Sequence, residues 1–295
     1  MELLQLRYFV ALAHRQHLTQ TAKEMMVTPS AISISISRLE EELGVKLFDR
    51  VGRNICLNEY GAAYLQHAEA VLNQLTDGAL RIQEMKRSVE SSLTLGVWNP
   101  QVWQGPIQAF HAIHPEITIN QVTFDPVSSS FDLIQRGVEL IIASPDSFND
   151  PKWEGTRLFN DKIVLAVPPQ HRFASRKSID LYEARDERFV ATTLDTFSKR
   201  CYELCLEAGF TMKSPVKCDY TLRPKIMASE NMLCLITYHG TFTGFYAGAH
   251  LVEITNPCDI RPENIYWRKS RYLSEAVRVA RDFFIDYYKD FEIVL

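Results

Sequence analysis

The stretch TPSAISISISRLEEE, from Thr28 to Glu42, decides the fold of the N-terminal part of the chain. Its middle alternates isoleucine and serine, and such alternation is typical of a half-buried β-strand. The flanks favour a helix, because Thr28 can cap a helix N-terminus, Pro29 suits the first helical position and Gly44 suits the end. A strand would have to stop at Arg38 and restart as a helix with no breaker between them.

Helical periodicity resolves this ambiguity. At 3.6 residues per turn, one apolar stripe is formed by four residues of the segment: Ile32, Ile36, Leu39 and Leu43. Ile34 falls outside that stripe, on the face that carries three serines, Ser30, Ser33 and Ser37. We therefore predict a helix, despite a propensity cost of roughly half a kcal/mol for each β-branched residue.

The flanking segments complete a winged helix-turn-helix domain. Amphipathic spacing predicts one helix over residues 3–15 and another from residue 18 or 19 to residue 26. Three short helices, with a tight turn before the third, are the pattern of a helix-turn-helix unit. The text after Gly44, VKLFDRVGRNICLNEYG, predicts a small β-hairpin wing, so we assign residues 1–58 to a DNA-binding domain.

A long helix is predicted from Glu59 to about Val89. Its apolar residues recur at spacings of three and four, and after the first turn Gly78 is the only helix breaker within it. A helix of this length exceeds what one small domain needs to bury, so we interpret residues 59–89 as a linker helix that pairs two subunits. A core helix of the following domain is the alternative.

Strands and helices alternate after Ser91. Strands are predicted at 92–98, 115–124, 138–144 and 161–169, with helices at 101–114 and 128–137. The pattern repeats after His171, with strands at 187–193, 215–220 and 232–238, helices at 197–209 and 224–231, and a closing helix at 275–289. Such alternation is typical of parallel βαβ units.

Two similar α/β halves predict a bilobed ligand-binding domain over residues 90–295, with a cleft between the lobes. We place lobe I at about 90–161 and 267–295, and lobe II at about 162–266. The chain is thus predicted to be an α/β protein with a mostly helical N-terminal part.

Composition describes an ordinary globular protein, with 46% hydrophobic and 23% charged residues among 295. No membrane span or secretory signal is visible, so we expect a cytoplasmic protein without a membrane partner. The net charge of -4 gives no global argument for nucleic acid. Any DNA contact must therefore depend on where charges are placed.

Six cysteines are scattered through the chain without the C-x-x-C pairs of a zinc or thioredoxin-like site. We interpret them as reduced thiols and predict no metal or cofactor. Cys201 and Cys205 lie four residues apart in a predicted helix, beside Arg200, whose charge would lower a thiol pKa. A thiol-based redox response is therefore the alternative to a ligand response.

With these parts in order, the sequence resembles the LysR-type transcriptional regulators over its whole length. The most specific match is AKEMMVTPSAISISISRLEEELGVKLFDR, from Ala22 to Arg50, followed at the family's spacing by Arg53, Leu57, Gly61 and Leu65. The resemblance implies a winged helix-turn-helix, a linker helix that pairs subunits and a regulatory domain of the periplasmic-binding-protein type (type 2). It also implies homodimers that assemble into homotetramers, bind promoter DNA, respond to a small effector and contact RNA polymerase.

The predicted DNA-binding residues come from three places. The recognition helix offers Thr28, Pro29, Ser30, Ser33, Ile34 and Ser37. Serine hydroxyls can bond phosphates and base edges, and an exposed isoleucine can pack on a thymine methyl. Backbone phosphate contacts are predicted for Thr19, Gln20 and Thr21, and charge is supplied by Arg38, Arg50 and Arg53. A plain solvated face is the alternative for Ser33 and Ser37.

The predicted effector-binding residues lie where strands end and helices begin. On one side of the cleft they are Trp98, Asn99, Pro100, Ser128, Ser129 and Ser130, and on the other they are Thr193, Thr196, Phe197 and Ser198. Hydroxyls and N–H groups suit a small anionic or polar organic ligand, and the aromatic rings give an apolar wall. Each residue could instead be a helix cap or a core aromatic.

An enzyme on the bilobed domain is the remaining alternative. It would require a nucleophile or metal constellation, and the sequence suggests none. His111 and His114 are three residues apart, but no third ligand or paired base is suggested by the spacing.

Overall fold

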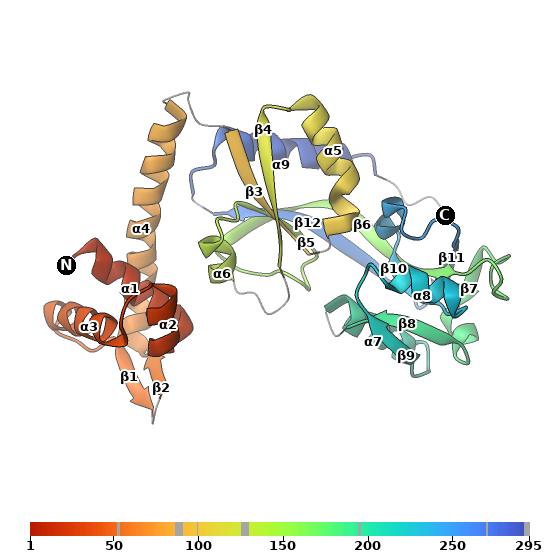
Figure 1. Cartoon of the computed structure of the whole chain (residues 1–295), viewed down its shortest axis with the longest axis horizontal. Helices are drawn as coiled ribbons and strands as arrows, with labels where there is room; N and C mark the ends of the chain where they lie inside the picture. The colour runs from red at the N-terminus through yellow and green to blue at the C-terminus, as the bar shows by residue number, and fades with distance from the viewer. Residues whose placement is uncertain are drawn as a thin grey trace. The chain divides into compact units, whose positions relative to one another are not determined.

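The computed structural model describes residues 1–51, 54–85, 91–98, 100–124, 130–193, 196–269 and 271–291. The chain divides into two compact units, Met1–Val89 and Glu90–Leu295, which are described separately (Figure 1). The domain limits predicted within these units remain predictions. Among the described residues, no helix is both long enough and apolar enough to cross a membrane.

The first unit has three short helices, a hairpin and a long helix. In chain order they are α1 (Leu3–Arg15), α2 (Leu18–Glu24), α3 (Pro29–Leu43), β1 (Phe48–Val51), β2 (Asn54–Leu57) and α4 (Glu59–Met85). β1 and β2 pair antiparallel, with Phe48 opposite Leu57. The isoleucine–serine stretch is therefore helical, as its longer periodicity predicts.

The core of the first unit brings the hairpin and α4 together around α1. Phe9 is fully buried, and its ring centroid lies 5.7 Å from that of Phe48 and 5.3 Å from that of Tyr64. Gly61 permits this close approach of α4, because a Cβ there would come 2.2 Å from the Leu47 carbonyl oxygen.

The second unit is built on one continuous sheet. Its strand order is β4-β3-β5-β12-β6-β11-β7, and β10 also pairs with β6. These strands are β3 (Ser91–Val97), β4 (Ile117–Thr123), β5 (Leu140–Ala143), β6 (Trp153–Val167), β7 (Ser178–Asp180), β10 (Cys234–Thr237), β11 (His250–Asn256) and β12 (Ile260–Arg268). A separate parallel pair is formed by β8 (Arg188–Thr192) and β9 (Lys213–Cys218).

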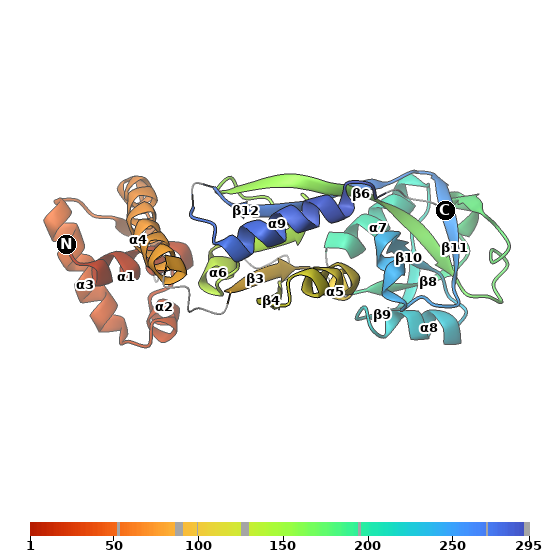
Figure 2. The ribbon, with the colours of Figure 1, turned by 90° about the horizontal axis from the view of Figure 1, so that it is seen from above.

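Helices cover the sheet and define two lobes. They are α5 (Gln104–Ile113), α6 (Ser130–Gln135), α7 (Thr196–Glu207), α8 (Arg223–Ser229) and α9 (Glu275–Tyr288), with 3-10 turns η1 (Pro100–Trp103), η2 (Leu181–Ala184) and η3 (His239–Thr243). In lobe I, α9 packs beside β3, β6 and β12 (Figure 2). Lobe II contains α7, α8 and strands β7 to β11, with a hydrophobic core of its own.

The prediction of purely parallel βαβ units is wrong for the middle of the sheet. β3 is parallel to β4 and β5, but β12 is antiparallel to both β5 and β6. β10 and β11 also run antiparallel to β6. The sheet is therefore mixed, and two long strands, β6 and β12, carry the chain between the lobes.

Strand β12, which returns from lobe II, places a few residues that we predicted for lobe II in the sheet of lobe I. Residues 264–266, which we assigned to lobe II, belong to β12 and pair with Ile141, Ile142 and Ala143 of β5. β12 was not predicted, because Pro262 within it argues against a central strand. The ladder accommodates this residue next to a register shift between Glu263 and Asn264.

Candidate functional site

The first candidate site is the exposed face of α3. Thr28 caps this helix by accepting a hydrogen bond from the Ala31 N–H at 3.2 Å, and Pro29 occupies the first turn. Ile34 is 56% exposed, whereas Ile32 and Ile36 are 0% and 5% exposed. An apolar side chain at the centre of an exposed helix face is available for contact with a partner.

The polar residues of this face differ in exposure. Ser30, Ser37 and Arg38 are exposed, and Ser33 is half-buried. The Ser30 hydroxyl lies 2.9 Å from the Thr28 hydroxyl, so these two groups are already paired with each other. The remaining hydroxyls and Arg38 surround Ile34 with hydrogen-bonding groups.

The start of α2 fits the prediction in part. Thr19 and Gln20 are exposed, but Thr21 is fully buried, and its hydroxyl donates to the His17 carbonyl oxygen at 3.0 Å. The prediction of a phosphate contact is therefore wrong for the Thr21 side chain. The Gln20 N–H is not free either, since it donates to Nδ1 of His17 at 3.3 Å.

The wing presents Arg50, and sequence reasoning missed the residue that anchors it. Arg50 is exposed on β1, and Arg53 lies outside the described residues. Glu40 is buried at the back of α3, where its carboxylate accepts from the Leu47 N–H at 2.9 Å and from Lys46 Nζ at 2.7 Å. This carboxylate fixes the start of the wing relative to the recognition helix.

The second candidate site is a pocket of the C-terminal unit, with a cavity volume of ≈ 90 Å³. Lobe I contributes aromatic and small residues from the end of β3, η1 and β5, and lobe II contributes residues from α7, α8 and η3. The residues used below are Trp98, Trp103, Ser144, Asp161, Phe197, Tyr220, Arg223, His239, Phe245, Tyr246, Arg261 and Glu263. A pocket lined from both lobes is suited to a small ligand that bridges them.

Two of the predicted effector-binding residues line this pocket, Trp98 and Phe197. Trp98 has an indole N–H without a hydrogen-bond partner in the described parts of the chain. Thr196 lies just behind the wall, with its hydroxyl 3.0 Å from that of Ser147.

The other predicted effector residues are elsewhere. Thr193 is exposed and does not line the pocket, and Ser130 begins α6 away from it. Ser198 is buried and donates to the Thr192 carbonyl oxygen at 3.2 Å. These three positions correct the prediction. Pro100 begins η1, and Asn99, Ser128 and Ser129 lie outside the described residues.

Charged residues on the crossing strands are the main feature that the sequence did not reveal. Asp161 of β6 stands opposite Arg261 of β12 in the ladder, and Glu263 follows two residues later on the same face. All three line the pocket. In the sequence IRPENIYW, residues 260–267, the two charged residues are two positions apart. This spacing would have predicted charges on one face of a strand, had β12 been recognised as a strand.

The Asp161 carboxyl is held by its surroundings. It accepts hydrogen bonds from the Lys162 N–H at 2.7 Å and the His239 N–H at 3.1 Å. Burial raises its pKa to about 6, although these N–H groups and the nearby Arg261 guanidinium favour the charged form. Burial also lowers the pKa of His239 to about 4, so this imidazole is neutral at pH 7.

The Glu263 carboxyl accepts no hydrogen bond from a described backbone N–H group. Burial and the neighbouring charge of Asp161 raise its pKa to about 8, while Arg261 opposes the shift. Arg261 itself donates to the Ser144 hydroxyl at 3.3 Å and lies 3.8 Å from the exposed carboxylate of Asp146. None of the residues that the structure describes hydrogen-bonds Glu263, and most of these carboxyls are protonated at pH 7.

Arg223 brings a second buried cation to the pocket. It is 3% exposed, and it donates to the Tyr246 hydroxyl at 3.0 Å and to the Leu235 carbonyl oxygen at 3.2 Å. Burial raises the pKa of Tyr246, so this partner is neutral. Within the described ranges no carboxylate forms an ion pair with Arg223. With Arg223 and Arg261 charged and Glu263 mostly neutral, the pocket favours an anion.

The thiols are poorly placed for a redox response. Cys201 and Cys205 are buried, and burial raises the pKa of Cys205 to about 12. Arg200 already forms ion pairs with Glu207 at 2.6 Å and with Asp259 at 3.0 Å. Its charge is therefore not free to stabilise a thiolate. In the described parts of the chain, no three His, Cys, Asp or Glu side chains gather as a metal site would require.

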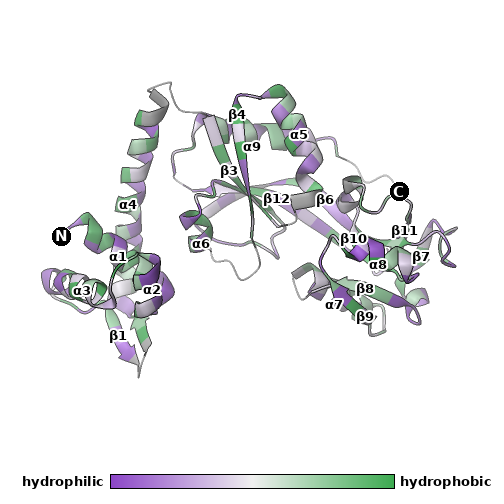
Figure 3. Ribbon diagram, in the orientation of Figure 1, coloured by the Kyte–Doolittle hydropathy of each residue, from purple (hydrophilic) through white to green (hydrophobic). Residues whose placement is uncertain are grey.

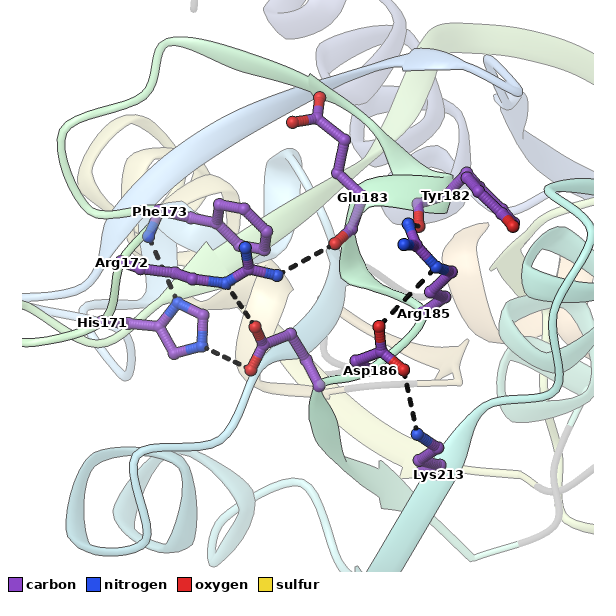
Figure 4. Close-up of polar contacts among 9 residues, drawn as sticks. His171, Arg172, Phe173, Tyr182, Glu183, Arg185, Asp186 and Lys213 are labelled. Carbon is purple, nitrogen blue, oxygen red and sulfur yellow. Dashed lines mark hydrogen bonds and ion pairs between the residues drawn. The ribbon is translucent and has the colours of Figure 1, made fainter.

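A polar network on the outside of lobe II is structural (Figure 4). Nδ1 of His171 accepts from the Phe173 N–H at 3.3 Å, which leaves the proton on Nε2, 3.1 Å from Glu187. Arg172 binds the same carboxylate at 2.6 Å and the Glu183 carbonyl oxygen at 3.0 Å. A neutral imidazole satisfies both of its contacts, so the network is complete without a ligand.

Comparison with known proteins defines the class. Residues 3–62 match the bacterial regulatory helix-turn-helix proteins of the lysR family, and residues 88–289 match the LysR substrate binding domain. The chain therefore belongs to the LysR family of transcriptional regulators, with a helix-turn-helix DNA-binding domain and an effector-binding domain. The predicted fold class, a winged helix-turn-helix with a bilobed type 2 domain, is confirmed.

Individual relatives extend over nearly the whole chain. The uncharacterised regulator YybE of Bacillus subtilis is 28% identical over 319 residues, covering 98% of this chain and 100% of YybE. A full-length OxyR variant from Pseudomonas aeruginosa superposes with a TM-score of 0.66 at 23% identity, covering 96% of this chain and 94% of that one. Full-length CbnR bound to its target DNA gives a TM-score of 0.54 at 19% identity, covering 98% and 99%. At these identities the two structures support the fold alone.

Proposed function

We propose that this LysR-family regulator reads its operator with the exposed face of α3 and responds to a small anionic or polar organic effector in the pocket. The observation that carries the effector proposal is the pocket itself, which is lined from both lobes and holds two buried arginines, Arg223 and Arg261. A ligand that contacts both lobes binds one arrangement of them better than others, and so shifts the equilibrium between arrangements.

Pairing of subunits through α4 belongs to the same proposal. Val71, Leu75 and Ile82 are 47%, 50% and 58% exposed, and they fall on one side of the helix at 3.6 residues per turn. Figure 3 shows hydrophobic and hydrophilic residues alternating along α4. We propose a homodimer through this stripe, assembling to a homotetramer in the cytoplasm that contacts RNA polymerase.

Promoter DNA is the proposed macromolecular ligand, and the CbnR structure with its target DNA supports that proposal by shared fold. The relatives reported above are transcriptional regulators, and no catalytic role is proposed for the pocket. The burial of Cys201 and Cys205 favours a ligand response over a thiol response.

The proposal is tested with purified full-length protein and the DNA upstream of its own gene. Fluorescence anisotropy at fixed salt should show tighter binding to that DNA than to a shuffled sequence, because phosphate contacts alone do not discriminate. A screen of small organic acids by thermal unfolding should find a compound that raises Tm, since ligand binding stabilises the folded state. Equal affinity for both DNA sequences would contradict the operator-reading proposal.

A further inference from the structure

We infer that the effector is a bifunctional small acid, with an anionic group bound by Arg223 and a hydrogen-bond-donating hydroxyl or ammonium group bound by Glu263. This inference rests on the proposed function of the pocket and names the chemical class of its ligand. It follows from which charged groups of the pocket already have partners and which do not.

Arg223 is the cation that lacks an anion. Its guanidinium has five N–H donors, and its two hydrogen bonds go to a neutral hydroxyl and a carbonyl oxygen. The rings of Tyr220 and Tyr246 lie 5.5 and 5.9 Å from it. Buried charges in proteins are as a rule paired, because an unpaired one loses its hydration without compensation. A carboxylate in the pocket supplies the missing pair.

Arg261 is less available for that role. It already bonds Ser144 and approaches Asp146, and its guanidinium lies 5.6 Å from the Phe197 ring. Its position therefore supports an anion in the pocket through charge, while Arg223 offers unused donors.

Glu263 is the acid that lacks a donor. Asp161 beside it accepts two backbone N–H groups, but no described group donates to Glu263. A carboxyl that lines a ligand pocket without a partner has full acceptor capacity for the ligand. A hydroxyl or ammonium group on the ligand donates to its oxygens, whereas a ligand that carries only a carboxylate supplies no donor and can only accept from the protonated form of Glu263.

The pocket that these two groups line also has aromatic walls. Trp98 and Trp103 come from lobe I, and Phe197 and Phe245 come from lobe II. Aromatic walls bind a planar or apolar body between two polar ends. The ligand class is therefore a compact carbon skeleton with a carboxylate and a donor group at separate positions.

The test uses four compounds on one ring skeleton and the full-length protein. They are meta-(aminomethyl)benzoate and meta-(hydroxymethyl)benzoate, which carry both groups, and meta-methylbenzoate and meta-methylbenzylamine, which carry one group each. Affinities measured by calorimetry should favour one of the two bifunctional compounds over both monofunctional ones by about tenfold, the effect of one good charge-assisted contact. The ammonium and hydroxyl compounds together distinguish the two kinds of donor.

Variants assign the two contacts. Glu263→Gln should remove most of the advantage of the bifunctional compound over meta-methylbenzoate, while Arg223→Gln should weaken every carboxylate of the panel by about tenfold or more. Arg223→Lys keeps the charge and should retain part of the affinity if Arg223→Gln folds poorly. Glu154→Gln on β6 and Arg278→Gln on α9, both exposed and away from the pocket, serve as matched controls.

Three results overturn the inference. They are equal binding of acid-only and bifunctional compounds, a preference that Glu263→Gln leaves unchanged, and the absence of binding by all four compounds. None of these results affects selective binding of promoter DNA, so a wrong ligand class is distinguishable from a wrong proposed function.

Discussion

Ile34 differs in exposure from the two isoleucines that flank it on the same helix. Its neighbours Ile32 and Ile36 are buried in the core, whereas Ile34 is 56% exposed among hydroxyl groups. Because an exposed side chain contributes little to the core, we propose that Ile34 contacts a partner surface. In the major groove of DNA, we propose the methyl group of thymine as that surface.

Shortening Ile34 tests this role. We expect Ile34→Ala and Ser33→Ala each to reduce discrimination between operator and random DNA by roughly 1 kcal/mol or more. Arg50→Ala should weaken binding to both DNAs about equally, because a phosphate contact carries no sequence information. Anisotropy titrations at one salt concentration measure both, with Ile113→Ala as an exposed isoleucine control. The reverse pattern would contradict our assignment of the groove-facing side.

Glu263 gives the pocket a dependence on pH. Burial raises its pKa in the folded state to about 8 from the ordinary value of 4.5, so the folded state binds this proton more tightly than the unfolded state does. The stabilisation that comes from binding this proton is complete below the pKa of Glu263 in the unfolded chain. It is lost as pH rises through the folded-state pKa of about 8.

The direction of this pH dependence of stability can be checked by comparing Glu263→Gln with the unsubstituted protein. We expect the free energy of unfolding of the unsubstituted protein to fall relative to the variant as pH rises from about 5 to about 9, at up to about 1.4 kcal/mol per pH unit. Asp161, Arg261 and Asp146 face this group and are present in both proteins. A difference between the two proteins that does not change with pH would show that Glu263 is not buried as described.

For individual side chains, the sequence predicted which ones are exposed better than which ones are buried. The exposed serines and Ile34 follow from helical spacing alone, but Thr21 and Ser198 are buried because neighbouring elements cover them. The pocket carboxyls were missed for the same reason, since their environment is made by strands that are distant in the sequence.

Among the elements, α4 has the most sharply defined packing requirement. Its first turn crosses the loop before β1 so closely that only glycine fits at position 61. Farther along, its apolar residues have no partner in the described part of this chain that would bury them. The same helix is thus a core element at one end and a candidate interface at the other.

Gly61→Ala should destabilise the first unit by about 1 to 3 kcal/mol, because the added methyl group meets the Leu47 carbonyl oxygen and the Leu57 side chain. Urea unfolding at fixed protein concentration measures the change. Gly105→Ala is the matched control, since that helical position has nothing within 4 Å, and alanine is the better helix former. Equal stability of the two variants would contradict the close packing.

Leu75→Glu should shift the protein from dimer to smaller species, because it places a charge in the centre of the exposed apolar stripe. Analytical ultracentrifugation measures the shift. Gln66→Glu adds the same charge nine residues earlier, on the opposite side of the helix at 3.6 residues per turn, and should leave assembly unchanged. If both variants remain fully dimeric, the interface is elsewhere.

The sequence predicted most elements, including the helix that began as an apparent strand. β7, β11 and β12 were missed, and the cause is clearest for β12. Its pattern mixes charges with a proline, and it becomes a strand because β5 and β6 supply partners on both sides. Local pattern cannot show partners of this kind.

For the whole molecule, the central expectation is a response to a ligand rather than to oxidation. The buried state of Cys201 and Cys205 denies oxidants access to their sulfurs. Operator binding should therefore be insensitive to peroxide, and the double variant Cys201→Ala and Cys205→Ala should respond like the unsubstituted protein. Gel shifts with and without peroxide, including a Cys258→Ala control for the exposed thiol, test this. A peroxide effect that disappears only in the double variant would favour the redox alternative.

The two crossing strands also make the second lobe exchangeable. Lys162 of β6 stands directly opposite Ile260 of β12, so the chain enters and leaves lobe II at adjacent positions on one ribbon. Segments whose ends lie close together are those that proteins accept as insertions. Residues 163–259 can therefore be treated as a replaceable segment, and recombination between family members at this rung of the ladder should produce chimaeric regulators that keep their operator and carry a new lobe II side of the effector pocket.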